Sequence, residues 1–318
     1  MAKEGNVMKA LETIFPVFFM IFIGLLSRIK GWITPEQKEG ANKIVFNVLF
    51  PIMIFNVLFT SSIEASDLTL VLYVLIAFSL TLIIGFLIRN FTGKKWAHFS
   101  PFLLTTTEGG NVALPLYTSI VGMSYAKNTV IFDIAGTILA FIIVPIYVEK
   151  ATSESTDIKS LLKNIFTNSF VVAVMLGIIL NLTGFHHFLM STPLGSVYTK
   201  TISQATAPIV GMILFIIGYN LKIKKDMINS LLKLLVIRFV LFACIIAGFF
   251  ILFPSLMADK IYLMAVLIYF MSPTGFAMPM IIEPLNKTEE DADFQAAFLS
   301  LGMFITLIVY TCVVIFIA

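Results

Sequence analysis

Residues 105–117 read TTTEGGNVALPLY, and residues 270–281 read FMSPTGFAMPMI. Each stretch lies inside an apolar segment long enough to cross a bilayer, and each contains a matching tetrapeptide, ALPL at 113–116 and AMPM at 277–280. Unpaired backbone groups are costly at membrane depth unless protein buries them or they line a wet cavity. Two Gly/Pro-interrupted segments at corresponding positions predict a binding site near the bilayer midplane.

The composition is that of a membrane protein. Hydrophobic residues make up 59% of the chain and charged residues 12%, with a mean hydropathy of +0.99, whereas soluble domains carry about 25% charged residues. Cys244 and Cys312 lie in apolar stretches without metal or redox spacing. The apolar run after Lys9 has no small-residue cleavage site behind it, so we interpret it as a first membrane helix.

Ten apolar segments of membrane-spanning length are predicted: 11–30, 41–60, 68–89, 99–122, 127–148, 161–183, 200–220, 229–253, 261–283 and 294–317. The longest polar linker separates the fifth from the sixth. We therefore expect a first five-helix repeat at 1–150, a cytoplasmic linker at 151–163 and a second repeat at 164–318. Because each half has an odd number of spans, the second half enters from the opposite side. The predicted fold is an all-α membrane protein of ten transmembrane helices, arranged as two inverted five-helix repeats with broken crossing helices 4 and 9.

The matching prolines support this pairing of the halves. Pro51 and Pro208 correspond in segments 2 and 7, as Pro115 and Pro279 do in segments 4 and 9. The alternative is that Pro and Gly are simply common in membrane helices. We expect interrupted backbone around 108–111 and 272–275, with Pro115 and Pro279 close together near the midplane.

Loop charges predict the orientation, because cytoplasmic loops carry an excess of Lys and Arg. The loops after odd-numbered spans hold fourteen such residues and the opposite side holds five. Both termini are therefore expected outside the cytoplasm, in a multi-pass protein of the cell (plasma) membrane. The acidic run at 289–291 is interpreted as a solvated helix start.

Glu108 is the residue most indicative of function. A carboxylate at mid-membrane depth usually faces a cavity, a charge partner or a proton path. It therefore indicates a proton or cation coupling site, or alternatively a static partner for a cation or for freed backbone N–H groups. Asp133 and Arg238 are costly at similar depth; they either pair with one another, serve the site, or extend towards an interface.

Polar and small residues flank both predicted breaks. Their side chains either bind substrate or satisfy freed backbone groups, and the glycines allow a ligand to approach the backbone closely. Half-helix N-termini there would suit a carboxylate substrate. The candidate substrate-binding residues are Glu108, Gly109, Gly110, Asn111, Pro115, Ser272, Pro273, Thr274, Gly275 and Pro279, with Thr107 beside them.

Over nearly its whole length the chain resembles the auxin efflux carrier family, which contains plant PIN-type auxin exporters and many bacterial permeases. The resemblance rests on NVLFPIMIF at 47–55, residues 108–116, APIVGMILFIIGYNL at 207–221, and residues 272–279. It implies ten spans in inverted repeats, a scaffold of spans 1, 2, 6 and 7, and a mobile bundle of spans 3 to 5 and 8 to 10. It also implies a homodimer that moves organic anions by an elevator-like movement. The family usually has Asn where this chain has Glu108.

The leading function is a secondary carrier of small organic anions, such as malate or malonate, which is the substrate class that the resemblance implies. No ATP-binding motif is present, so the energy is expected to come from a gradient or from exchange. A proton- or sodium-coupled carrier of a neutral or cationic solute is the alternative that Glu108 favours. An intramembrane lipid-handling protein, a channel or a sensor is the alternative of another class. Enzymatic activity, a cofactor, a metal and nucleic-acid binding are not expected, since no motif for them occurs.

Overall fold

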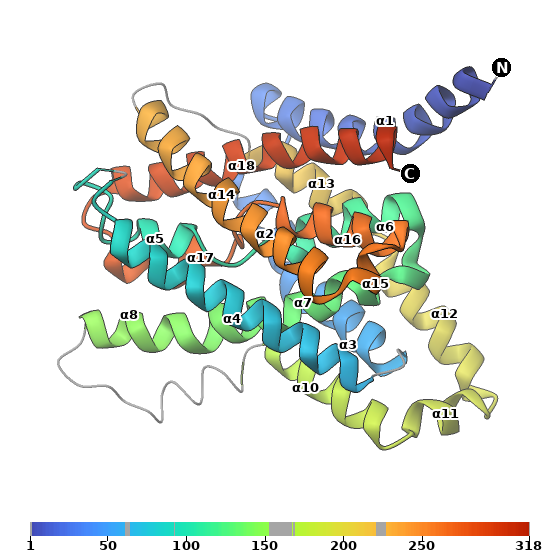
Figure 1. Ribbon diagram of the computed structural model, residues 1–318. Coiled ribbons are helices and arrows are strands. Elements are labelled where there is room, and N and C mark those ends of the chain that lie inside the picture. The colour runs from blue at the N-terminus through green and yellow to red at the C-terminus, as the bar shows by residue number, and fades with distance from the viewer. Residues whose placement is uncertain are drawn as a thin grey trace.

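The computed structural model describes residues 2–60, 64–91, 93–152, 167, 169–220 and 227–317. Within these ranges the chain forms helices and turns, without a strand (Figure 1). Most of the predicted linker at 151–163 lies outside the described residues.

The first half consists of helices that are repeatedly interrupted. They are α1 (Ala2–Lys30), α2 (Pro35–Ile44), α3 (Phe50–Thr60), α4 (Ala65–Ile88), α5 (Ser100–Leu103), α6 (Leu114–Val121), α7 (Lys127–Ile138) and α8 (Val144–Thr152). Three π-helical turns, Val45–Leu49, Gly109–Ala113 and Leu139–Ile143, lead directly into α3, α6 and α8. Each is followed within two residues by a proline, Pro51, Pro115 or Pro145. Proline lacks the N–H that an α-helix needs and its ring crowds the preceding turn, so a widened turn at these points has a local cause.

The second half has longer helices and one long interruption. It comprises α10 (Ser169–Leu182), α11 (Phe185–Met190), α12 (Leu194–Thr206), α13 (Ile209–Asn220), α14 (Ile228–Leu252), α15 (Pro254–Met257), α16 (Lys260–Phe270), α17 (Met278–Ile281) and α18 (Glu289–Phe316). Short 3₁₀ turns at Met123–Tyr125 and Glu283–Leu285 complete the described structure.

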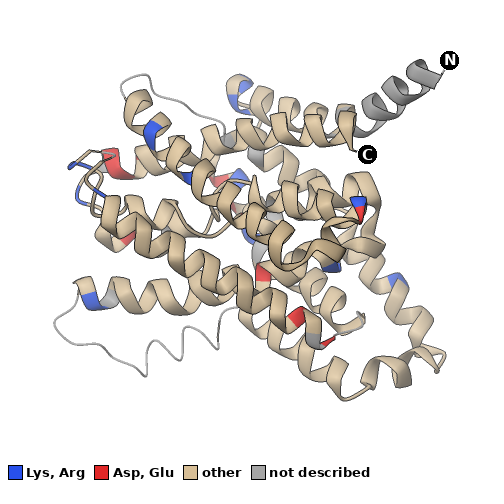
Figure 2. Cartoon of the chain, in the orientation of Figure 1, with Lys and Arg blue, Asp and Glu red and all other residues tan. Residues whose placement is uncertain are grey.

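Six helices are long and apolar enough to cross a membrane: Pro35–Thr60, Ser66–Ile88, Lys127–Thr152, Leu194–Ile216, Ile228–Leu252 and Glu290–Phe316. They coincide with six of the ten predicted spans. Charged residues are sparse along the helices (Figure 2), and many large apolar side chains are exposed, among them Leu87, Ile251 and Phe316. Exposed apolar surface of this extent marks an interface with lipid, so the chain is a multi-pass membrane protein. The ten-helix inverted repeat itself stays a prediction.

The densest helix contacts fall within two groups, although α1 also packs on α18 and α3 on α7. In the scaffold group, defined here as α1–α3 and α10–α13, α1 packs on α13 and α3 on α10. In the crossing group, α4–α8 and α14–α18, α4 packs on α7, α16 on α6 and α14 on α18. α10, α11 and α12 lie together at one end of the molecule, in yellow-green (Figure 1). The partition into a scaffold and a mobile bundle, which the family resemblance implies, stays a prediction.

Close backbone contact holds α1 against α13. A Cβ atom on Gly24 would lie 2.0 Å from the carbonyl oxygen of Phe215, and one on Gly218 would lie 1.8 Å from that of Ile21. Small residues at a membrane helix interface allow such an approach. The Arg28 guanidinium adds a hydrogen bond to the Tyr219 carbonyl, at 3.0 Å.

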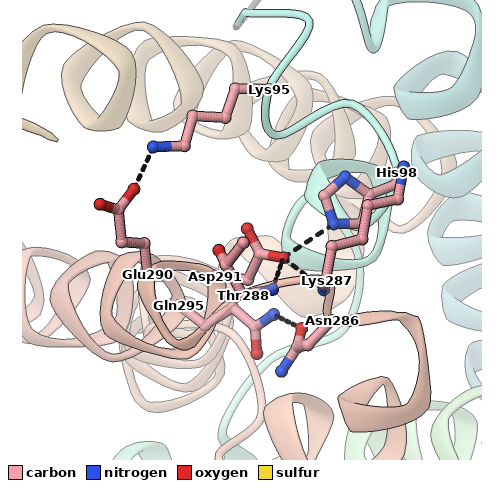
Figure 3. A network of polar contacts seen from close by, with 8 residues as sticks. All are labelled: Lys95, His98, Asn286, Lys287, Thr288, Glu290, Asp291 and Gln295. Carbon is pink, nitrogen blue, oxygen red and sulfur yellow. Dashed lines mark hydrogen bonds and ion pairs between the residues drawn. The ribbon is translucent and has the colours of Figure 1, made fainter.

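The start of α18 is tied to the loop that precedes α5 (Figure 3). The Asp291 carboxylate accepts the backbone N–H of Lys287 at 2.7 Å and lies 3.1 Å from Nε2 of His98. Glu290 and Lys95 form an ion pair beside it. Asp291 is only 1% exposed, so the prediction of a solvated acidic run is wrong at this position: the carboxylate is a buried helix cap.

Candidate functional site

The first broken segment runs through the middle of the crossing group. α5 ends at Leu103, and helical structure resumes at Gly109. Between them Thr106 has a φ of +54°, a conformation that is rare for a β-branched residue. Residues 101–110 are all buried. The interruption precedes the predicted 108–111, because Gly109–Asn111 already belong to the widened turn before Pro115.

The second broken segment lies between α16 and α17. α16 ends at Phe270 and α17 begins at Met278. The predicted interruption at 272–275 falls inside this stretch. Ser272, Pro273 and Thr274 are buried, whereas Gly275 is half-buried.

The two breaks are in direct contact. The backbone N–H of Glu108 donates to the carbonyl of Pro273 at 2.7 Å. The Thr274 hydroxyl donates to the carbonyl of Leu103 at 2.6 Å. Backbone groups freed by one interruption are thus satisfied by the other, which is how irregular backbone is tolerated at membrane depth. Pro115 and Pro279 lie in α6 and α17, the helices that follow the two breaks.

Arg238 joins both breaks from a third helix. Its guanidinium, carried by α14, donates to the carbonyls of Leu103 at 3.3 Å, Thr105 at 3.4 Å, Thr106 at 2.8 Å and Ser272 at 3.1 Å. It is 4% exposed and lies 3.9 Å from the centre of the Phe242 ring.

This arrangement gives the crossing a buried positive charge. Among the described residues, the ion pairs are Lys38–Glu39, Lys95–Glu290, His98–Asp291 and Lys127–Asp67, and Arg238 belongs to none of them. Carbonyl groups solvate a guanidinium without cancelling its charge. The crossing therefore holds this positive charge in the same place as the buried Glu108 carboxylate.

The Glu108 carboxylate reaches across to the second break. It accepts the backbone N–H of Phe276 and is 6% exposed. The backbone carbonyl of Glu108 accepts the N–H of Ala113 at 3.1 Å, and this bond belongs to the widened turn that leads into α6. Glu108 is thus a buried acid at the meeting point of both segments, in the place where sequence analysis expects a coupling residue.

The glycines of the two breaks differ in what surrounds them. A Cβ atom on Gly109 would lie 2.0 Å from Oδ1 of Asp133, and one on Gly110 would lie 1.7 Å from the Phe50 ring. These two glycines therefore make room for neighbouring side chains. A Cβ atom on Gly275 would instead meet three oxygens, Oγ1 of Thr106 at 3.6 Å, the carbonyl of Thr107 at 3.8 Å and Oε2 of Glu108 at 3.9 Å.

Two hydroxyl groups in the first break are buried without a hydrogen-bond partner. They are Oγ1 of Thr106 and Oγ1 of Thr107, on residues 2% and 5% exposed. A buried hydroxyl without a partner costs about 1–3 kcal/mol. Buried hydroxyls of this kind are usually satisfied by an ordered water or by a bound ion or ligand.

The Asp133 side chain lies against Gly109, on the side that a Cβ atom would occupy. The Tyr269 hydroxyl donates to its Oδ1 at 3.2 Å. Its side chain also lines a narrow crevice, too small to hold a water molecule, with Ile54 of α3 and Val174 of α10. Asp133 therefore faces the boundary between the crossing group and the scaffold group. The ion pairs described above do not join it to Arg238.

A small hollow lies beside Arg238. It is lined by Phe242, Ser272, Pro273 and Gly302. It adjoins the second break, and its interior has room for about one water molecule. The crossing is therefore closed and densely packed in this conformation.

Sequence reasoning placed most of the candidate residues at one location, with exceptions. Glu108, Gly109, Ser272, Pro273, Thr274 and Gly275 come together with Arg238 at the crossing. Asn111 lies in the widened turn, and its side chain is outside the described part of the chain. Thr106, Tyr269 and the N–H of Phe276 were missed. The run of three threonines before Glu108 in an apolar span is a signal by which Thr106 could be found.

Fold and site together define a polytopic membrane protein whose polar interior is built where two broken helices meet. The sequence profile of the membrane transport protein family matches residues 9–317, and the chain belongs to this family. The resemblance to the auxin efflux carrier and PIN-like proteins is thereby confirmed. The protein is a membrane transporter, from a family of carriers rather than enzymes. A search of curated proteins finds no match.

Proposed function

We propose that the protein is a secondary permease for small organic anions, with a dicarboxylate of the size of malate or malonate as the substrate. The observation that carries this proposal is the buried Arg238 charge, which the described ion pairs leave without a carboxylate partner. A buried charge is costly unless a compensating group accompanies it. A substrate carboxylate at the crossing would supply that compensation.

The guanidinium acts through its charge and through the backbone that it holds. The Nη1 and Nη2 atoms of Arg238 already donate their hydrogen bonds to backbone carbonyls. An anion would therefore bind to the polar groups next to the guanidinium. The buried Thr107 hydroxyl, which has no described partner, is available for this role. The compact crossing requires opening before a substrate enters, because its hollow holds about one water.

The division into two packing groups supports an elevator-like movement. Several long-range hydrogen bonds of the described residues lie within one group, as for Tyr198 with Asn56 and Asn181 with Leu58 in the scaffold group. Tyr73 donates to the Ile245 carbonyl inside the crossing group in the same way. We therefore assign the scaffold role to α1, α3, α10 and α13, and the moving role to the crossing group. A homodimer formed through the scaffold, in the cell membrane with both termini outside, completes the proposal.

Coupling is assigned to Glu108. In its charged form the carboxylate would repel an anionic substrate at the same crossing, so transport of an anion requires that a proton or a cation neutralise it. The second candidate function, a coupled carrier of a neutral or cationic solute, rests on the same carboxylate together with Asp133.

Uptake into proteoliposomes tests the proposal. Radiolabelled malonate and malate would be supplied outside, with and without unlabelled substrate inside. We expect the vesicles to accumulate the radiolabelled acid. Unlabelled malonate added outside should block this uptake, whereas uncharged malonamide should not. Vesicles that take up neither acid, in both sodium and potassium media at two pH values, would overturn the anion assignment.

A further inference from the structure

Three oxygens of the first break lie beside Gly275 of the second, and we call this group of atoms the niche. The side of Gly275 that a Cβ would occupy faces Oγ1 of Thr106, the carbonyl of Thr107 and Oε2 of Glu108, at 3.6–3.9 Å from that position. Thr106 Oγ1 is buried and without a partner. The Thr107 carbonyl accepts the Gly109 N–H at 3.0 Å, which leaves it a second lone pair. The niche thus presents a hydroxyl, a carbonyl and a carboxylate.

We propose that this niche binds Na⁺ as the coupling ion. Hard cations take oxygen ligands, and unwound backbone carbonyls at broken membrane helices coordinate Na⁺ in secondary transporters. The inference rests on the proposed function, since it names the ion that the carrier uses. Thr106, Thr107 and Glu108 supply the ligands from one break, and Gly275 of the other break supplies the space.

The charges of the surrounding groups select a monovalent ion. The niche holds one carboxylate, and the Arg238 guanidinium contacts the Thr106 carbonyl nearby. Groups of three or more acidic, His or Cys side chains that would hold a divalent metal do not occur among the described residues. One Na⁺ neutralises Glu108, so that the Arg238 charge remains to match an anionic substrate. Ion and substrate binding would then favour each other.

The surroundings of Gly275 allow a substitution that should fill the ion site without disturbing the fold. In Gly275→Ala the added methyl meets its neighbours at ordinary van der Waals distances, with none closer than 3.6 Å. The fold is therefore retained while the space for the ion is filled. Thr106→Val removes the hydroxyl and keeps the β-branched shape, whereas Thr106→Ser keeps the hydroxyl. Gly211→Ala is the matched control, because its methyl meets only Met20, at 3.8 Å, on the scaffold.

The experiment is a thermal-unfolding titration of purified protein with NaCl, in which choline chloride keeps the ionic strength constant and KCl serves as the comparison. The unfolding temperature of the wild-type protein should rise with NaCl and not with KCl. The rise should saturate, and it should be about 2 °C at a Na⁺ concentration ten times the Kd. Gly275→Ala and Thr106→Val should weaken Na⁺ binding at least tenfold, while Gly211→Ala and Thr106→Ser keep it.

Three results would overturn the inference: the same response to Na⁺, K⁺ and choline, a response to pH alone, or an unaltered Na⁺ response in both niche variants. No substrate enters this measurement, so its failure is distinguishable from a failure of the anion assignment. A protein that accumulates malonate without binding Na⁺ would keep the proposed function and lose this site.

Discussion

Replacing Arg238 tests both the architecture of the crossing and the source of its positive charge. Arg238→Met preserves the length of the side chain and removes its charge and its donors. The carbonyls of Thr105, Thr106 and Ser272 then lose this donor, whereas the Leu103 carbonyl keeps the Thr274 hydroxyl.

The expected loss of stability follows from competing contributions. Three buried acceptors that lose a donor cost about 1–3 kcal/mol each. Removing a buried charge returns several kcal/mol of desolvation, and a water in the adjacent hollow can satisfy part of the deficit. We expect a net loss of about 3 kcal/mol for Arg238→Met, or roughly 4 to 5 °C in unfolding temperature for a chain of this size. Arg238→Lys keeps the charge and three donors, so its loss should be about half as large.

The two variants separate structure from charge in the transport assay. Malonate uptake should fall at least tenfold in Arg238→Met, whereas Arg238→Lys should retain a measurable part of it. Lys233→Met, at an exposed position of the same helix, is the control and should leave both readouts unchanged. An Arg238→Met protein with wild-type unfolding temperature and wild-type uptake would refute the assigned role.

Further predictions concern coupling, packing and orientation. Glu108→Gln, which mimics the neutral acid, and Glu108→Asn, which restores the usual family residue, should keep the fold and flatten the dependence of uptake on pH and Na⁺; identical dependence in all three proteins would make Glu108 structural. Gly24→Leu should disrupt the α1–α13 contact and lower the unfolding temperature by several degrees, since overpacking costs about 1–3 kcal/mol, while Gly40→Leu, with no atom within 4 Å of its Cβ position, should be tolerated in the same melt. In cysteine-free protein, a cysteine at Gly5 should react with an impermeant reagent outside intact cells and one at Ser155 should not; the reverse pattern would invert the topology.

The sequence was sufficient to locate the broken segments, because Gly and Pro act on the backbone locally. The first interruption was misplaced by a few residues, since the widened turn before Pro115 absorbs Gly109 and Gly110 without leaving helical geometry. The sequence also indicated the apolar spans and the importance of Glu108.

Other features depend on contacts that no local pattern records. The Arg238 guanidinium binds carbonyls more than a hundred residues earlier in the chain, and a carbonyl is present at every position, so its partners have no sequence signature. The roles of Gly109 and Gly275 look alike in the sequence. They differ only because Asp133 lies over one and three oxygens lie beside the other.

The hydrogen bonds of the Arg238 guanidinium also determine which helices can move relative to one another. If α14 moved relative to one of the breaks, Arg238 would lose its hydrogen bonds to that break. α14 and the two broken segments must therefore move as one rigid body. The Phe50 ring of α3 faces Gly110 instead, and this apolar contact can be exchanged at little cost. A disulfide between α14 and a broken segment should therefore leave transport running, whereas one between α3 and the widened turn at Gly109–Ala113 should stop it.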